Sequence, residues 1–522
     1  MIDDNSPAPD GITRRDALAL VGAGAASLSM GSPAAAQSPS RITFGLGIGP
    51  TGLFFDPGNT PGTGAPLVIQ YALHDALIRP MRGVGSAGLS LAEHMEQAKN
   101  GLAHTFRLRE GLTFQNGDPL TAEDAKFSFD RYKGANANSI RSFVEKAEVL
   151  DKRTVRYVLK ERWPDFLTIF GTPASGVAWI LPKAYFEKVG EQGFLARPIG
   201  AGPYRISNFT PGTRLDMEAF KGYWRKKPNV EQLIMKVIPD PTTRLAAIQN
   251  GEIDITWAIQ GDLIEQAKQN SKLRIENAEL PVTNFVIFAS MNDPASPWSN
   301  EKVRRAANMA IDREGIRKAA YAGMGHLSSS IIPHIMDYYW PAPPIAYDPK
   351  AAKALLAEAG FPNGFDGGDF YTSTDEVYPP FVQSNLNAIG IKVRMRPAER
   401  AAMLQTLAQK KVTGLAQTGS GSPGNASTRL QQFVASAGSL SFIKDAELDA
   451  AIAAQAKETN ESKRKEMLFA IQKKLYDKSM FMPVIEFPFP VVIGPRIDYA
   501  GVNGIPGNPY TAPYEDLSLK KG

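Results

Sequence analysis

The stretch "TFRLREGLTFQNGDPLTAEDAKFSFDRY", residues 105–132, contains the local signals that decide the fold. At its start, apolar residues alternate with arginines, which predicts a half-buried strand. The "NGDP" that follows predicts a turn. Thr121 and Asp124 then form a capping-box pattern ahead of an apolar helix face. With a second alternating strand, "RTVRYVLK" from Arg153, the stretch predicts an α+β unit.

Strand and helix patterns alternate along the rest of the chain. The segment "TTRLAAIQNGEIDI" predicts a helix that ends at a glycine and leads into a short strand. In "YDPKAAKALLAEAG", Asp348 is the expected N-cap and Gly360 the expected stop. A helix over "KRKEMLFAIQKKLYDK" precedes the apolar strand "MPVIEFPFPVVIG". This alternation favours an α/β architecture.

The composition limits the classes of function. The chain has 522 residues, enough for two to four domains, with 43% apolar and 21% charged residues and a net charge of +5. It has no basic run with interleaved aromatics, so nucleic acid is not an expected partner. Cysteine is absent, which excludes disulfides, thiolate metal sites and a cysteine nucleophile.

The N-terminus predicts export. Arg14 and Arg15 precede a weakly apolar segment rich in alanine and glycine, and Ala36 ends a run of small residues that suits a signal peptidase. The paired arginines resemble a twin-arginine export signal. We therefore expect residues 1–36 to be removed and the mature chain to reside in the periplasm. The alternative is a chance pair of arginines before a disordered tail.

The sequence offers no catalytic or metal-binding motif. None of the histidines is part of H-E-x-x-H or paired with another at i+4, and G-x-S-x-G is absent. Gly47, Gly49 and Gly52 have the G-x-G-x-x-G spacing, but the Gly/Pro-rich run after them leaves no room for the helix that a dinucleotide site needs. No catalytic residue, cofactor or metal is therefore predicted. The alternative is a catalytic serine or carboxylate whose partners are brought together only by the fold, which no sequence motif would reveal.

Seven segments, taken together and in order, resemble the periplasmic solute-binding proteins of ABC importers, in the large peptide/opine/nickel-binding family. They are the opening stretch, "PIGAGPY", "GYWRKKP", "NGEIDI", "VRRAANMAIDR", "YDPKAAKALLAEAGF" and the helix before "PVIEF". The resemblance implies an α/β fold with two lobes, of the type II (cluster C) periplasmic-binding-protein kind, and a small α+β domain inserted near the N-terminus. The expected boundaries are 37–78, 166–284 and 486–522 for a discontinuous lobe I, 79–165 for the inserted domain and 285–485 for lobe II.

The resemblance also implies a function. We expect a monomeric substrate-binding subunit that closes two lobes around a peptide or other small polar solute and delivers it to an ABC permease and its ATPase. Two rival hypotheses are a secreted hydrolase of a similar solute and a binding protein that feeds a sensor.

The stretch from Lys411 to Lys444 contains no acid. Relatives that bind free-amine peptides carry a "W-x-x-D-x-x-x-P" pattern here. Aligned on Pro423, this chain has Ala416 for the tryptophan and Gly419 for the aspartate. Peptides are the default ligand that the resemblance implies. Because a buried ammonium needs a partner, the missing acid disfavours a free-amine peptide and favours an opine-like, sugar-acid, other anionic or N-blocked solute.

Matching family positions one at a time gives the candidate ligand-binding residues. Those in the acid-free stretch are Gln417, Thr418, Ser420 and Arg429, with Ser422 and Asn425 beside them. Those elsewhere are Phe54, Phe55, Arg141, Trp257, Thr283, Asn284, Arg400 and Glu486. Each has an alternative role in the core or on the surface. Glu486 lies in an apolar run, where an acid must either meet the ligand or pair with a residue such as an arginine.

Overall fold

The computed structural model describes residues 40–60, 65–81, 85–259, 261–421 and 424–521. The predicted export signal, residues 1–36, and Ser422 lie outside the described residues. From Ser40 onward the described residues form one compact unit. No helix among them is long and apolar enough to cross a membrane.

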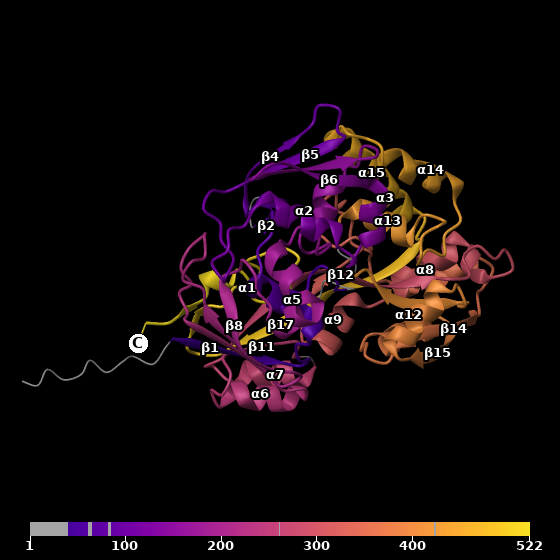
Figure 1. The fold of residues 1–522 in the computed structure, drawn as a ribbon. Coiled ribbons are helices and arrows are strands. Elements are labelled where there is room, and N and C mark those ends of the chain that lie inside the picture. Colours follow the sequence, from indigo (N-terminus) through magenta and orange to yellow (C-terminus); the bar gives the residue numbers. More distant parts are fainter. Residues whose placement is uncertain (1–39, 61–64, 82–84, 260, 422–423, 522) are drawn as a thin grey trace, which may run out of the picture. The chain divides into compact units, whose positions relative to one another are not determined.

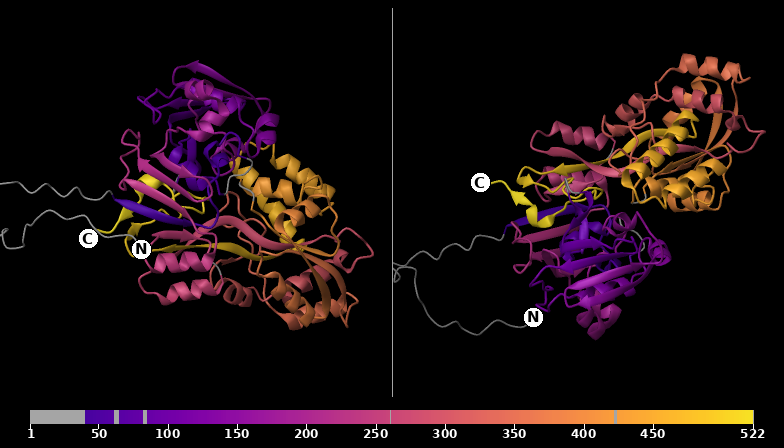
Figure 2. Two further views of the ribbon diagram at one scale, coloured as in Figure 1. Left: turned by 60° about the horizontal axis from the view of Figure 1, so that its bottom comes forward. Right: turned by 90° about the horizontal axis from the view of Figure 1, so that it is seen from above.

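One mixed sheet of eleven strands organises this unit. Its centre is a pair of long antiparallel strands, β12 (Arg274–Phe288) and β17 (Phe481–Ile493). Figure 2 shows these two strands, one magenta to pink and the other yellow, running side by side. Both strands take part in both halves of the sheet. Residues 491–493 of β17 pair with β11 in one half, and residues 284–288 of β12 pair with β16 in the other.

The elements around the first half of the sheet are termed lobe I. Its strands are β1 (Arg41–Leu46), β8 (Tyr204–Thr210), β9 (Arg214–Ala219), β10 (Gln232–Val237) and β11 (Ile255–Trp257). Strand β1 lies parallel to both β10 and β11. The main helices are α1 (Leu67–Leu73), α5 (Lys183–Ala196), α6 (Pro241–Gln249) and α7 (Asp262–Gln269). Helix α6 and strand β11 confirm the helix–strand prediction made from "TTRLAAIQNGEIDI".

The elements around the second half are termed lobe II. Its strands are β13 (His326–Leu327), β14 (Phe365–Ser373), β15 (Ile391–Ala398) and β16 (Leu415–Gly419). Its helices are α8 (Glu301–Ala310), α9 (Arg313–Tyr321), α10 (Pro349–Glu358), α11 (Pro379–Ala388), α12 (Arg400–Ala408), α13 (Ala426–Phe433), α14 (Ala446–Gln455) and α15 (Glu461–Asp477).

Both faces of the lobe II sheet are buried. In β12, Val286 and Phe288 belong to one apolar cluster, whereas Phe285 and Ile287 belong to another. Because successive side chains of a strand point to opposite faces, a strand covered on both sides reads as a continuous apolar run. The Asp348 carboxylate accepts the Ala351 N–H at 2.8 Å, which confirms that Asp348 is the N-cap predicted for α10.

A separate four-stranded sheet lies within residues 92–159 and is termed the small sheet. Its order is β4 (Ala92–Gln97), β5 (Ala103–Leu108), β7 (Thr154–Leu159) and β6 (Val144–Asp151). Helices α2 (Ala122–Asp130), α3 (Ala137–Phe143) and α4 (Phe166–Phe170) accompany it, and a hairpin of β2 (Ile78–Met81) and β3 (Gly85–Leu89) precedes it. The predicted capping box of Thr121 and Asp124 is present. Figure 1 shows these elements grouped in purple.

The expected domain boundaries stay a prediction. The small sheet falls inside the expected insert, 79–165, and strands β13 to β16 fall inside 285–485. The boundaries expected at 284/285 and 485/486 lie within β12 and β17, the two strands shared by both lobes.

His104 of the small sheet is a buried, neutral histidine. Its ring stacks on Phe166 with centroids 4.2 Å apart, and among the described residues neither ring nitrogen has a hydrogen-bond partner. Burial lowers the pKa of His104 to about 4. The unfolded chain therefore binds more protons than the folded chain between pH 6.5 and 4, so this residue reduces stability as the pH falls through that range.

We expect His104→Phe to change the free energy of unfolding little at pH 7.5, because the ring keeps its stacking. At pH 5 the variant should be more stable than the wild type by about 2 kcal/mol, since no proton is taken up on unfolding. Urea unfolding at both pH values measures this. His94→Gln, at an exposed position, is the control. Equal pH dependence in the His104→Phe variant and the wild type would contradict the assignment.

Candidate functional site

Five of the predicted ligand-binding residues meet where β12 pairs with β16. Asn284 lies opposite Gly419, and Phe285 opposite Thr418. The Ser420 N–H donates to the Thr283 carbonyl at 2.9 Å, and the Thr283 N–H donates to Ser420 Oγ at 3.1 Å. Gln417 is in the same strand, β16, and its Oε1 accepts the Ser373 N–H at 2.9 Å. These residues are termed the strand-end cluster: Thr283, Asn284, Gln417, Thr418 and Ser420.

Arg429 of α13 adds a buried cation to the strand-end cluster. Its side chain is fully buried, and its Nη2 donates to the carbonyl of Pro281, two residues before Thr283, at 2.9 Å. Its Nε and Nη1 have no partner among the described residues. Burial lowers the pKa of Arg429 to about 9, with no acid to offset it. An unpaired buried charge is costly, so this guanidinium is suited to an anion from outside the chain.

Arg313 shows what a buried arginine of this protein does when it has only a structural role. It is also buried, at 5% exposure, yet its Nε donates to the Pro483 carbonyl at 2.8 Å and its Nη1 to the Asn308 carbonyl at 3.0 Å. Its Nη2 donates to the Asn308 side chain at 3.1 Å. Arg429 lacks such a set of acceptors among the residues that the structure describes. Within the same residues, the buried hydroxyls of Thr283 and Thr418 are further donors of the strand-end cluster without a partner.

An acid that the sequence analysis missed also reaches this cluster. The Asn284 Nδ2 donates to Glu376 Oε2 at 3.1 Å, and the predicted residue Arg400 donates to Glu376 Oε1 at 2.8 Å. Arg400 also donates to Asp375 at 2.7 Å, so its guanidinium is paired by the chain itself. Burial raises the pKa of Glu376, and Arg400 opposes this rise. The side chain of Glu376 is only 4% exposed.

A buried ion pair joins the end of the small-sheet region to lobe II. The Arg464 Nη2 lies 2.8 and 2.7 Å from the two carboxylate oxygens of Asp165, and the Asn425 Nδ2 donates to the same carboxylate at 2.6 Å. Asp165 is the N-cap residue of α4, Asn425 caps α13 and Arg464 belongs to α15. Both charged side chains are almost fully enclosed, at 5% and 2% exposure.

A cavity of about 590 Å³ lies beside this ion pair. One side is formed by residues of α3, the segment 161–165 and α4, and the other by residues of α13, α14 and the loop between them. Thr428, the neighbour of Arg429, is among its lining residues. The elements that form the two sides, α3 and α13, are labelled close together in Figure 1.

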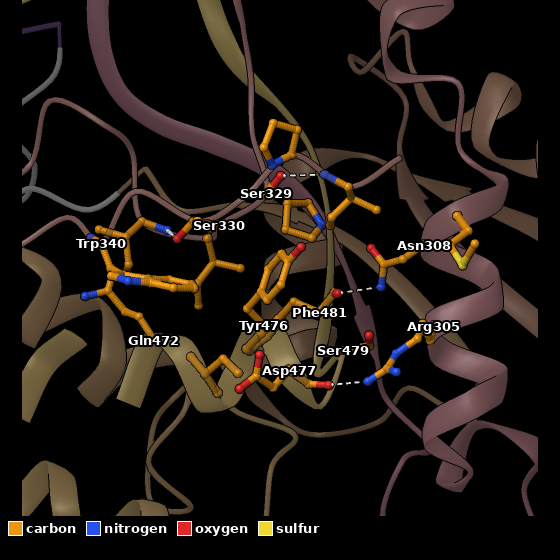
Figure 3. Close-up of a pocket in the computed structure, with 18 of the residues that line it drawn as sticks. Arg305, Asn308, Ser329, Ser330, Trp340, Gln472, Tyr476, Asp477, Ser479 and Phe481 are labelled. Atoms are coloured by element: carbon orange, nitrogen blue, oxygen red, sulfur yellow. Dashed lines mark hydrogen bonds between the residues drawn. The ribbon is translucent and has the colours of Figure 1, made fainter. Parts of the chain in front are cut away.

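A second cavity, of about 470 Å³, is formed by lobe II alone. Figure 3 shows its lining residues from α8, α15, β17 and the segment 329–346. Its polar groups are paired within the chain: Arg305 donates to the Asp477 carbonyl at 2.7 Å, and Asn308 to the Phe481 carbonyl at 2.9 Å. This cavity therefore presents no uncompensated charge comparable to that of Arg429.

Glu486 pairs with a histidine rather than an arginine. The backbone N–H of His334 donates to its Oε1 at 3.0 Å, and the His334 Nδ1 lies 2.5 Å from its Oε2. This hydrogen bond raises the pKa of His334. Contact of Glu486 with the ligand stays a prediction.

The remaining predicted residues have other contacts. Phe55 is fully buried edge-on against Phe209, with ring centroids 4.8 Å apart, and Phe54 is half-buried against the same core. Trp257 is buried and stacks on Phe44 at 5.3 Å. The Arg141 Nη2 donates to three backbone carbonyls, those of Phe129, Asp130 and Tyr132. These contacts do not include the strand-end cluster, and a ligand-binding role for the four residues stays a prediction.

We expect Arg464→Met to lower the free energy of unfolding by about 3–5 kcal/mol, because the carboxylate of Asp165 is then left buried without a cation. The double variant Asp165→Asn/Arg464→Met should recover most of that loss, since neither charge remains. Urea unfolding measures the stability of the single and the double variant, and the dependence of the free energy of unfolding on urea concentration should be unchanged in both. Arg394→Met, at an exposed ion pair with Asp366, is the control and should cost less than about 1 kcal/mol. A loss no larger than that of the control would contradict the role given to the pair.

Comparison with known proteins shows the family and the fold of the chain. Residues 88–441 match the family model described as bacterial extracellular solute-binding proteins, family 5 Middle. A glutathione-binding protein of Escherichia coli K12 is 31% identical over 422 residues, covering 76% of this chain and 80% of the relative. Its counterpart in Salmonella typhi is 32% identical over 419 residues, with the same coverage.

Solved structures match the fold. The substrate-binding protein CtaP of an ABC transporter from Listeria monocytogenes gives a TM-score of 0.80 at 22% identity, covering 92% of this chain and all of that one. HbpA2 from Haemophilus parasuis gives 0.79 at 24% identity, with the same coverage. These matches confirm the predicted two-lobed α/β fold. Members of the family are extracytoplasmic, bind peptides or other small solutes and work with ABC permeases, so the predicted solute-binding function is also confirmed. The chain belongs to the bacterial extracellular solute-binding proteins of family 5.

Proposed function

We propose that this solute-binding protein takes a small solute that carries a carboxylate, and that Arg429 binds this carboxylate. The observation that supports the proposal is the fully buried guanidinium, which among the described residues has two nitrogens without a partner and no acid beside it. A carboxylate can accept two N–H bonds from one guanidinium, and such charge-assisted pairs are the strongest hydrogen bonds in proteins. The hydroxyls of Thr283 and Thr418, which have no hydrogen-bond partner in the part of the chain that the structure describes, are further donors near the same strand ends.

Glu376 offers an acid to a free amine of the solute, which the acid-free stretch does not. The acid-free stretch disfavours a free ammonium, but Glu376 reaches the strand-end cluster from the loop after β14 and contacts Asn284. A solute with both a carboxylate and an amine can therefore find partners of both signs. Glutathione is such a compound, and the relatives at about 31% identity are named for binding it. Structures of the same fold are described with mannopinic acid and with agropinic acid, which are also carboxylates.

We expect Arg429→Gln to weaken binding of a carboxylate solute by at least about 30-fold, because removing one member of a buried charged pair costs 2 kcal/mol or more. Isothermal titration with glutathione, opines, dipeptides and dipeptide amides measures the effect. The variant should fold at least as stably as the wild type without solute, since an uncompensated charge is removed. Arg394→Gln, far more exposed, is the matched control.

Two results of this titration would overturn the proposal. One is tight binding of a dipeptide amide, which has no carboxylate, with equal affinity in the wild type and in Arg429→Gln. The other is a carboxylate affinity that falls no further in Arg429→Gln than in Arg394→Gln.

We also propose that the protein acts by binding alone, as an exported monomer that lacks residues 1–36 and serves an ABC permease with its ATPase. Native mass spectrometry of the protein from the periplasm should give the mass of one chain that begins at Gln37. Glutathione incubated with this protein should be recovered with unchanged mass, whereas a hydrolase would return fragments. A fragment that forms only in the presence of the protein would contradict binding without chemistry.

A further inference from the structure

Two histidines that are far from Glu486 in the sequence meet it in the fold. Glu486 lies in β17, opposite Thr283 of β12 on one side and opposite His326 of β13 on the other. Directly opposed residues of neighbouring strands direct their side chains to the same face of a sheet. The side chains of Glu486 and His326 therefore share one face at the point where β17 passes from lobe I to lobe II.

His334 completes the group. Its backbone N–H and its ring Nδ1 both contact the carboxylate of Glu486, as described above, and its ring stacks on that of His326 with centroids 4.5 Å apart. One donor atom from each of His326, His334 and Glu486 lies within 4.8 Å of the other two. No other group of three or more such residues comes this close within the described part of the chain.

The backbone fixes this juxtaposition. Gly325, directly before β13, has a φ of +86°, and a Cβ at this position would lie 2.8 Å from the Glu486 carbonyl oxygen and 2.9 Å from Ile485 Cδ1. Both the left-handed conformation and the close approach require glycine. Gly325 thus allows β13 to lie against β17 with His326 opposite Glu486.

The charges of the group are those of a cation site. Glu486 is 5% exposed, and the only partner found for its carboxylate in the described residues is His334. No lysine or arginine there forms an ion pair with it. Since a buried carboxylate needs a cation or several donors, this side chain has capacity for a further positive partner.

We propose that His326, His334 and Glu486 bind a divalent transition-metal ion of the Zn²⁺ or Ni²⁺ kind. Two imidazoles and one carboxylate form a donor set that suits these ions, and three protein donors leave a coordination position for water or an anion. The His326 Nδ1 lies 3.0 Å from the Leu327 carbonyl. An N–H there donates to a backbone oxygen, which leaves Nε2 for the metal, the arrangement usual for metal-bound histidines.

Little movement is needed to bring the donors to a metal. Ligand atoms bound at about 2.0–2.1 Å in a tetrahedral site lie roughly 3.3 Å apart, and here they lie within 4.8 Å. His326 is exposed and the side chain of His334 is 36% exposed, so both rings can turn. The site does not use Arg429, so metal binding and carboxylate binding can be tested separately.

The test is titration of the untagged mature protein with ZnCl₂ and with NiCl₂ by calorimetry, after treatment with EDTA and its removal. We expect one ion per chain, and we expect His326→Ala, His334→Ala and Glu486→Gln each to weaken binding by at least about tenfold. His94→Ala, at an exposed histidine of β4, is the matched control and should bind like the wild type. Arg429→Gln should also bind the metal like the wild type.

The visible absorption of added Co²⁺ reports directly on the ligands, and it should be lost in His326→Ala. Because His326 is exposed, this variant is expected to fold, and its thermal unfolding without metal should match that of the wild type. The proposal is overturned if no ion binds below about 100 µM, or if His326→Ala binds zinc or nickel as tightly as His94→Ala does.

Discussion

The antiparallel pairing of β12 with β17 is the constraint on which the rest of this structure depends. Each strand contributes to both halves of one sheet, so the two lobes are joined by backbone hydrogen bonds. The register between the strands shifts between Glu279 and Thr283 and again after Asn284. Such irregularities redirect side chains, and they occur where Thr283 and Asn284 enter the strand-end cluster. The candidate binding residues are therefore gathered where the lobes are connected.

Charge around this connection follows a consistent pattern. Asp165 is paired with Arg464, Glu376 with Arg400 and Glu486 with His334, and each of these acids is almost fully enclosed. Arg429 is the exception among the described residues of this region, because its charge has only a carbonyl as partner. In a protein whose function is to enclose a solute, an uncompensated buried cation is understood most simply as half of a pair that the solute completes.

The sequence predicts what is local and misses what is assembled over distance. The cap at Asp348, the capping box at Thr121 and the helix–strand alternation depend on neighbouring residues, and all are found in the structure. The five residues of the strand-end cluster were each named from the sequence as candidates, but their meeting depends on the pairing of β12 with β16. The partners of Asp165 and Glu486 were not anticipated, since 299 and 152 positions separate them from Arg464 and His334. The acid-free stretch likewise could not reveal that Glu376, from the loop after β14, contacts Asn284 of the strand-end cluster.

We infer that a solute is enclosed by movement of the lobes about β12 and β17, the two strands that join them. Because the chain has no cysteine, two can be introduced for dye labelling, at exposed Lys99 near the small sheet and exposed Glu466 in α15. Single-molecule energy transfer between the dyes should show a shorter distance on addition of glutathione, or of the tightest-binding carboxylate. A distance that stays constant while calorimetry shows saturation would contradict the account.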